Sequence, residues 1–540
     1  MAARWELVCR GDGGFTESLT GPKLSSRWGH DPARRVCFGG GGGGAGGAGG
    51  GGERQDVQLP EDLDTWEVDE RGMAYPLQLD DREVLLLSTW IRSGVWLLPS
   101  VTRLLEVRAT AADPELQIEV DPAAGVLGCL YVRLVGGRIE ARVAFGTDWR
   151  PLQLVMFAYG GVEEWMFNSW APPAPVGGPS PLLNSVWICK DSVRKSISGN
   201  SDAFQGLHGR SRIRPGSVSF TRPATDALQT KEGDVRFLPD VPPYIKARWT
   251  PGGHLLVRPT INGREWGEFL LDTGASGMVI TKQAADALRL EAFGELHVAG
   301  VGGRVESHFR QAKDFQLGPL LLKEPLFMQM GTDWLGIVES NEVAGIIGFD
   351  VFSRAMIEIP ARDNAGVSGR NGGDCWIGIF KPREVDELRL PDAERLLWHP
   401  LRMIARVPHV QVRFKQCPEH GALFLMDTGA RGVDLMFHSR AVKQLALATP
   451  RMRHVNLRGM GAKGGVKAVS ATMDWIELGG KRFEKCRAIF ALASDAGLDL
   501  SEWTVGVLCN EMLAKFNITL DYANRRVRFS HPHKPANAAK

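Results

Sequence analysis

The sequence has little of what marks a disulfide-rich, zinc-binding or membrane protein. Its eight cysteines in 540 residues never come within 20 positions of one another, which excludes a CxxC ligand pair and a dense disulfide framework and fits a reducing compartment. The longest apolar cluster, at 83–101, is interrupted by Arg92 and Ser93 and is too short for a membrane span. The N-terminus lacks the basic stretch and apolar run of a secretory signal. We therefore expect a cytoplasmic or organellar protein without a membrane span.

An excess of charge of one sign is also missing. The 64 Lys and Arg residues nearly balance the 62 Asp and Glu residues, and the formal net charge of +2 gives no electrostatic reason to expect nucleic-acid binding. Hydrophobic residues at 44% and charged residues at 23% are ordinary for a globular chain, which excludes wholesale disorder. A chain of 540 residues is long enough for several domains with sizeable cores.

The N-terminal half divides by composition into three segments. Residues 1–56 contain a run of glycines at 38–52 whose backbone entropy opposes a packed element, so we predict a disordered Gly-rich leader. Residues 57–175 carry period-two stretches such as RIEARVAF at 138–145 and predict a β-rich domain of unknown role. Residues 176–241 are crowded with Pro, Gly and Ser and predict a connector.

An internal repeat occupies the C-terminal part of the chain. LLVRPTINGREWGEFLLDTGASGMVI at 255–280 matches VQVRFKQCPEHGALFLMDTGARGVDL at 410–435 without a gap. Both segments place Asp-Thr-Gly-Ala in the same register, so that Asp272 and Asp427 are 155 residues apart. Each motif follows an apolar strand and precedes a helix-like stretch, KQAADALRL in one copy and SRAVKQLAL in the other.

Two further features recur downstream in the same order. AGVGGRVESH at 299–308 parallels RGMGAKGGVKA at 458–468, and GIIGFDVFSRAMIEI at 345–359 parallels GVLCNEMLAKFNITL at 506–520. Chance is a poor explanation for four features in one order. The repeat predicts the following segments: a first lobe at 242–361, a linker at 362–398, a second lobe at 399–530 and a tail at 531–540.

The repeated aspartates point to acid–base chemistry. Burial of an ionised carboxylate at the end of an apolar strand is costly and demands compensation. Packing of the two halves about a pseudo-two-fold axis would bring Asp272 and Asp427 together, and two carboxylates in contact share a proton. The charged member can then take a proton from water while the protonated member donates to a carbonyl oxygen, which is amide hydrolysis without a covalent intermediate.

The DTGA turn, Gly-rich hairpin and apolar-apolar-Gly segment, each present twice, resemble the retropepsin-like aspartic proteases, duplicated here in a single chain over about residues 242–530. The resemblance implies a mainly β, two-lobed aspartic protease fold, preceded by the β-rich N-terminal domain. It also implies an aspartic-type endopeptidase, a hydrolase of peptide bonds that uses a water activated by the Asp dyad. We expect no metal and no organic cofactor, an extended peptide or protein as substrate, and activity as a monomer.

The resemblance also assigns roles to residues. It implies that Asp272 and Asp427 are catalytic and that their turns are supported by Thr273, Gly274, Thr428 and Gly429. It implies one flap at Gly300, Gly302 and Gly303, and a second flap at Gly459, Gly461, Gly464 and Gly465. Ile346-Ile347-Gly348 and Val507-Leu508 would pack behind the two catalytic loops.

The second half departs from this pattern at two positions. Cys509 stands where the first half has Gly348, and Arg431 stands where it has Ser276. We expect the thiol to crowd the second turn, so that Cys509→Gly raises activity or at least leaves it unharmed, and the arginine to lower the pKa values of the dyad. The competing account is that neighbouring residues have adapted to the thiol, in which case its removal leaves a cavity. Two alternatives stay open: a catalytically weak or inactive protease-fold module that binds peptides, and an enzyme in which each Asp pairs with its counterpart in another chain.

Overall fold

The protein was analysed as a computed structural model. It describes residues 4–9, 15–20, 25–30, 65–68, 74–97, 99–110, 126–146, 150–158, 161–171, 188–198, 209–212, 218–219, 234–300, 303–331, 343–362, 372–382, 398–449, 451–457, 466–493 and 501–530. The chain splits into two compact units. The N-terminal unit comprises Met1–Val36, Glu61–Glu232 and Asp495–Trp503, and the C-terminal unit comprises Cys37–Pro60, Gly233–Ser494 and Thr504–Lys540.

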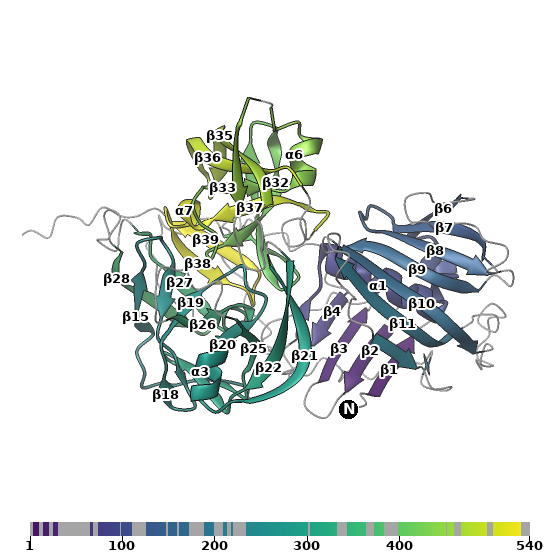
Figure 1. The fold of residues 1–540 in the computed structure, drawn as a ribbon, viewed down its shortest axis with the longest axis horizontal. Helices are drawn as coiled ribbons and strands as arrows, with labels where there is room; N and C mark the ends of the chain where they lie inside the picture. Colours follow the sequence, from purple (N-terminus) through teal and green to yellow (C-terminus); the bar gives the residue numbers. More distant parts are fainter. Residues whose placement is uncertain are drawn as a thin grey trace, which may run out of the picture. The chain divides into compact units, whose positions relative to one another are not determined.

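The N-terminal unit contains two sheets, antiparallel except where β1 pairs with β13 (Figure 1). The first has the order β13 (Val218–Ser219), β1 (Arg4–Cys9), β2 (Phe15–Thr20), β3 (Ser25–His30), β4 (Thr65–Val68) and β5 (Ala74–Pro76). The second has the order β12 (Gly209–Arg212), β11 (Ile188–Ser198), β10 (Gly161–Ala171), β9 (Pro151–Ala158), β8 (Glu140–Gly146), β7 (Val126–Leu134) and β6 (Leu105–Thr110).

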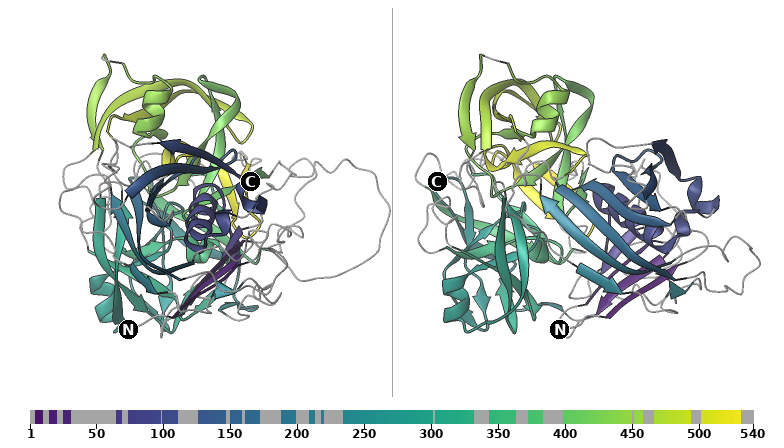
Figure 2. Two further views of the ribbon diagram at one scale, coloured as in Figure 1. Left: turned by 90° about the vertical axis from the view of Figure 1, so that its right-hand side faces the viewer. Right: turned by 45° about the vertical axis from the view of Figure 1, so that its right-hand side comes forward.

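Helix α1 (Leu79–Ser93) covers one face of the second sheet (Figure 2). It buries Leu86, Leu87 and Trp90 in the core of this unit, at the helical spacing that places them on one side. Gly94 ends the helix with a left-handed φ of 75°, which a residue without Cβ adopts at little cost. A 3-10 turn (Val95–Leu97) and the short α2 (Pro99–Thr102) follow. No helix in the described ranges is long and apolar enough to cross a membrane.

Two segments of the N-terminal unit differ from the sequence expectation. Strands β1–β3 lie in the predicted Gly-rich leader, and β11–β13 lie in the predicted connector. Phe15 of β2 is buried in the core of the unit, and β11 pairs with β10 along its length. The prediction followed local composition, whereas these strands are held by ladders with neighbouring strands, which composition does not reveal. The glycine run at 38–52 itself lies outside the described residues.

The C-terminal unit is built from three sheets. The first has five strands in the order β14 (Val235–Phe237), β24 (Leu320–Lys323), β23 (Asp314–Leu317), β17 (Thr260–Ile261) and β18 (Arg264–Glu265). The second has thirteen, in the order β21 (Glu291–Gly300), β22 (Gly303–Gln311), β25 (Leu326–Met330), β20 (Met278–Thr281), β26 (Val343–Ile347), β19 (Glu268–Leu271), β16 (Leu255–Val257), β15 (Tyr244–Trp249), β28 (Gly373–Phe380), β27 (Met356–Ile359), β38 (Asn517–Asp521), β39 (Arg526–Ser530) and β29 (His399–Pro400).

The third sheet has eight strands, in the order β30 (Arg402–Ile404), β31 (Val407–Phe414), β32 (Cys417–Asp427), β37 (Thr504–Cys509), β33 (Leu435–Phe437), β36 (Lys481–Ala491), β35 (Val466–Leu478) and β34 (Arg453–Leu457). Among the described residues, four short helices accompany these sheets: α3 (Lys282–Ala287), α5 (Phe349–Phe352), α6 (Ser439–Gln444) and α7 (Asn510–Leu513). The predicted mainly β class is confirmed. The helix-like stretches after the two DTGA turns form α3 and α6, as expected.

The segment predicted as a linker between the lobes contains a strand of the large sheet. β28 pairs with β15 on one side and with β27 on the other, and β27 pairs in turn with β38 near the C-terminal end of the chain. Gly and Asn around 365–374 favoured a linker, yet the alternating residues after Gly373 supply a buried strand face through Cys375, Ile377 and Ile379. The chain therefore crosses between the lobes as part of a sheet.

The two lobes share a local arrangement around their DTGA turns. β19 runs parallel to β26, and β32 runs parallel to β37, with Phe269 opposite Gly345 and Phe424 opposite Gly506. A Cβ at Gly345 would lie 2.2 Å from the carbonyl oxygen of Val279, and one at Gly506 would lie 2.1 Å from that of Met436. Both positions therefore require glycine, because a backbone oxygen occupies the space of a side chain.

Candidate active site

The two aspartates lie at the ends of equivalent strands. Asp272 directly follows β19 and its N–H donates to the carbonyl oxygen of Ile347 at 3.0 Å. Asp427 is the last residue of β32 and pairs with Cys509 of β37. Each keeps part of its surface accessible to solvent. The apolar segments expected behind the two turns thus form β26 and β37.

The threonines of the two motifs bind each other's turn. The Thr273 N–H donates to Thr428 Oγ1 at 3.0 Å, and the Thr428 N–H donates to Thr273 Oγ1 at 3.1 Å. Each hydroxyl also donates across, from Thr273 to the Met426 carbonyl at 2.6 Å and from Thr428 to the Leu271 carbonyl at 2.8 Å. Four reciprocal hydrogen bonds between buried groups lock the two turns face to face, because breaking one would leave a buried polar group unpaired.

Each carboxylate lies against the glycine of the opposite turn. A Cβ at Gly274 would meet Asp427 Cγ at 2.6 Å, and a Cβ at Gly429 would meet Asp272 Oδ2 at 2.6 Å. The two carboxyl groups also influence each other's pKa. The structure therefore brings together all six residues that the sequence singled out in the two turns, and the two glycines leave the room in which the carboxylates meet.

The hydrogen bonds distinguish the two carboxylates. Asp427 Oδ1 accepts from the N–H groups of Gly429 at 2.8 Å and Ala430 at 2.9 Å, whereas Asp272 Oδ1 accepts from Gly274 at 2.8 Å within its own turn. Burial raises both pKa values, and the neighbouring Asp427 charge raises the pKa of Asp272 further, well above its ordinary value. Donation from the Gly429 and Ala430 N–H groups favours the charged form of Asp427.

Arg431 does not produce the expected lowering of the dyad pKa values. Burial is the largest influence on both aspartates, and their pKa values move upward. Position in the sequence next to a turn does not decide where a long side chain places its charge. The expectation failed because it followed sequence proximity alone.

Cys509 is an integrated part of the core of the second lobe. Its side chain is fully buried, its N–H donates to the Asp434 carbonyl at 3.0 Å, and burial raises its pKa well above the ordinary value. Its φ of −84° and ψ of 164° lie in the broad extended region, which a residue with a Cβ adopts without strain. β37 extends through Cys509, whereas β26 ends at Ile347, one residue before Gly348. This geometry provides no strain for Cys509→Gly to relieve.

His254 is a contact of the second turn that the sequence analysis missed. It is buried at the start of the first lobe, and its Nε2 lies 3.1 Å from the carbonyl oxygen of Gly429. Because a carbonyl only accepts, Nε2 must carry the proton and donate. One signal was available: His409 occupies the same register in the second copy of the repeat, 155 residues later. His409 instead contacts the Val407 carbonyl, and burial lowers its pKa to about 3.

Replacing His254 with leucine should lower kcat about tenfold with little change in KM, because the Gly429 carbonyl loses its donor and the second turn shifts. His254→Gln should recover most of the activity, since its amide can donate near the Nε2 position. His409→Leu is the matched control and should spare kcat. Steady-state kinetics on the four proteins checks this, and equal kcat losses at both histidines would contradict it.

The structure describes part of the two predicted flaps. Gly300 and Gly303 pair at the tip of the β21–β22 hairpin, while Gly302 lies outside the described residues. In the second lobe, β34 and β35 form the corresponding hairpin. Its predicted glycines, Gly459, Gly461, Gly464 and Gly465, also lie outside the described residues.

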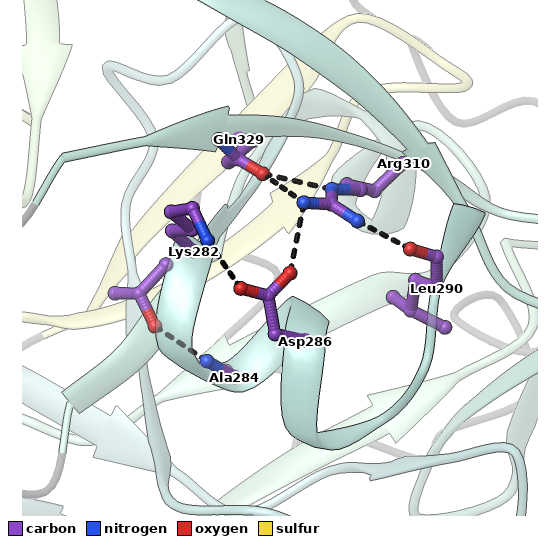
Figure 3. Close-up of polar contacts among 7 residues, drawn as sticks. Lys282, Ala284, Asp286, Leu290, Arg310 and Gln329 are labelled. Atoms are coloured by element: carbon purple, nitrogen blue, oxygen red, sulfur yellow. Dashed lines mark hydrogen bonds and ion pairs between the residues drawn. The ribbon is translucent and has the colours of Figure 1, made fainter. Parts of the chain in front are cut away.

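Arg310 anchors the stem of the first hairpin (Figure 3). From β22 it donates to Asp286 of α3 at 3.0 Å, to the Leu290 carbonyl at 2.5 Å and, through Nε, to Gln329 of β25 at 2.8 Å. Lys282 completes the group as an i,i+4 partner of Asp286. Since α3 follows the Asp272 turn in sequence, the network joins the hairpin stem to the helix behind that turn.

Comparison with known proteins agrees with this geometry. Residues 257–351 match a family model described as aspartyl protease. The match includes the Asp272 turn, the β21–β22 hairpin and β26, and Asp427 lies beyond it. No curated protein matched the sequence.

Solved structures of aspartic proteases align with the chain at low identity. The aspartic proteinase from Irpex lacteus aligns over 55% of this chain and 99% of its own, at 13% identity and a TM-score of 0.34. A retropepsin-like aspartic protease from Rickettsia conorii aligns over 25% of this chain and 93% of its own, at 15% identity and a TM-score of 0.17. Among the residues that the structure describes, no group of three or more His, Cys, Asp or Glu side chains could hold a metal ion.

Proposed function

We propose that the protein is an aspartic-type endopeptidase, formed by duplication of a retropepsin-like lobe in a single chain, in which Asp272 and Asp427 form one catalytic dyad. The contact of each carboxylate with the opposite turn carries this proposal. The reciprocal threonine bonds support it, because they hold the two turns in register. The proposed chemistry needs no cofactor.

The hydrogen bonds suggest different roles for the two aspartates. Asp427 begins ionised and takes a proton from water as the water oxygen attacks the peptide carbonyl carbon. Asp272 begins protonated and donates its proton to the carbonyl oxygen, which yields a neutral diol. When the C–N bond breaks, Asp427 returns its proton to the leaving nitrogen and Asp272 takes one from a diol hydroxyl. The dyad thus ends each cycle in its starting state.

The substrate in this proposal is an extended peptide beneath the hairpins. Two antiparallel hairpins, β21–β22 and β34–β35, offer backbone groups that an extended chain can pair with as an added strand. Both catalytic turns belong to one polypeptide, so we propose that the monomer is active. Mixing Asp272→Asn and Asp427→Asn chains should restore no activity, and rescue on mixing would show pairing between chains.

The test is cleavage of an unstructured protein by the purified full-length chain, with and without a statine-type inhibitor that mimics the diol. We expect cleavage, and we expect the inhibitor to block it. Binding of the inhibitor and of peptides without any cleavage would instead identify a peptide-binding module. Cleavage at an unchanged rate in the presence of the inhibitor would show that the reaction does not take place at the Asp272–Asp427 pair.

The raised pKa values predict the pH dependence of the reaction. Activity requires one proton on the pair, so it falls at low pH when Asp427 becomes protonated and at high pH when Asp272 loses its proton. Since both pKa values lie above the ordinary 3.8, both limbs of the profile should lie above that pH, with the alkaline limb moved furthest. A profile of kcat/KM against pH measures this, and an alkaline limb near pH 4 would contradict it.

A further inference from the structure

A short segment of the second lobe belongs structurally to the N-terminal unit. Asp495–Trp503 lies in sequence between β36 and β37 of the protease, yet it forms part of the compact unit that contains α1. Its described residues are Ser501, Glu502 and Trp503, and the next residue, Thr504, begins β37.

Asp80 of α1 binds the first two residues of this segment. The Ser501 hydroxyl donates to Asp80 Oδ2, and the Glu502 N–H donates to Asp80 Oδ1 at 3.1 Å. The Ser501 oxygen also accepts the Trp503 N–H at 3.0 Å, which fixes the turn of the segment. Asp80 is fully buried, so its carboxylate depends on these donors in place of water.

Glu83, one helical turn further along α1, binds the third residue. Its Oε1 accepts the indole N–H of Trp503 at 2.9 Å, while its Oε2 accepts the N–H groups of Arg138 at 2.8 Å and Ile139 at 2.7 Å. The Arg138 guanidinium lies 4.5 Å from the Trp503 ring centroid and donates to the Glu502 carbonyl at 2.9 Å. All three residues of the segment are therefore held by side chains of the N-terminal unit.

The binding groups are built into the core of that unit. Glu83 is 3% exposed, and a Cβ at Gly137 would lie 2.6 Å from Glu83 Oε2, so the glycine makes room for the carboxylate. Burying two carboxylates one helical turn apart is costly unless donors satisfy them, so a binding surface of this kind favours an occupant that supplies donors. The segment supplies donors to both carboxylates.

We propose that the N-terminal unit is a receptor for the Ser501–Trp503 segment and stays bound to the protease through it, as a permanent part of the enzyme and not as a removable propeptide. The proposal concerns binding and does not depend on catalytic activity. It predicts that the unit remains attached after the chain is cut between the two units.

The test uses the full chain with a recognition site for a sequence-specific protease inserted between Glu232 and Gly233, the border of the two units. After cleavage of the folded protein, the two fragments should elute together from a size-exclusion column. The variant Ser501→Ala with Trp503→Phe removes one donor to each buried carboxylate and keeps the aromatic ring. It should weaken the association about a hundredfold, since each such bond is worth about tenfold or more.

Ser470→Ala with Trp475→Phe is the matched control, because it makes the same changes on β35, where Arg482 lies 4.2 Å from the Trp475 ring centroid. This variant should co-elute like the wild type. In the uncut chain, hydrogen exchange of the Glu502 amide should be slow and should accelerate in Asp80→Ala, which removes its acceptor. Separation of the wild-type fragments, or equal retention of both double variants, would overturn the proposal.

Discussion

Replacing Asp427 with asparagine should reduce turnover of an unstructured protein by at least about a thousandfold, and Asp272→Asn should do the same. In the proposed mechanism the two carboxylates have separate roles, because Asp427 takes the proton of water and Asp272 supplies one to the carbonyl. Neither turn can substitute for the other, since the reciprocal threonine bonds fix both in place. Initial rates at the pH of maximal activity measure the effect.

Asp374→Asn is the control for these variants, since Asp374 lies on the surface, paired with Lys246. It should leave turnover unchanged. Near-normal turnover in Asp427→Asn would make the second turn structural and would end the dyad proposal.

The dyad variants should also change stability with pH. A folded-state pKa raised above the unfolded value contributes stability below the unfolded pKa, near 3.8, and loses it as the pH rises through the folded pKa. The wild type therefore bears the cost of its buried carboxylates at neutral pH. Asp272→Asn should raise the thermal midpoint at pH 7 and give no gain below pH 3.8. A lowered midpoint at pH 7 would show that the substitution damages the fold.

The second large effect is expected at Gly348. A Cβ there would lie 2.3 Å from the Gly277 carbonyl oxygen and 2.5 Å from that of Ala275, the oxygen that accepts the Phe349 N–H at 3.0 Å. Backbone atoms cannot move aside as a flexible side chain can. Gly348→Ala should therefore destabilise the protein by about 3 kcal/mol or more and displace the Asp272 turn. The thermal midpoint and the initial rate should both fall.

Cys509→Ala is the matched variant at the equivalent position of the second lobe. The strand conformation at Cys509 already accommodates a Cβ, so only the thiol is lost, at a cost of about 1 to 2 kcal/mol for the cavity. If Gly348→Ala were as stable as Cys509→Ala, the loop at Gly348 would have to move away from the Gly277 and Ala275 carbonyl oxygens. That result would contradict the prediction. Cys509→Gly should lower the midpoint and leave the rate no higher than in the wild type.

The sequence alone determined the main elements around the candidate site. The two DTGA turns could be identified because each follows an apolar strand and precedes a helix-like stretch, and local periodicity and turn chemistry specify such elements. The identical register of Asp272 and Asp427 in an ungapped repeat predicted that the two turns are equivalent. The same repeat held the signal for His254, because His409 follows at the same offset.

Only the tertiary structure decided how these elements meet. The reciprocal hydrogen bonds of Thr273 and Thr428 join turns that are 155 residues apart, and the donation from His254 to Gly429 crosses from one lobe to the other. The place of β28 in the large sheet and the place of Ser501–Trp503 in the N-terminal unit likewise depend on contacts with other segments of the chain. In each case the partners are far apart in sequence. When a distant segment buries a residue or supplies its hydrogen-bond donors, the local pattern of apolar and polar residues does not reveal that contact.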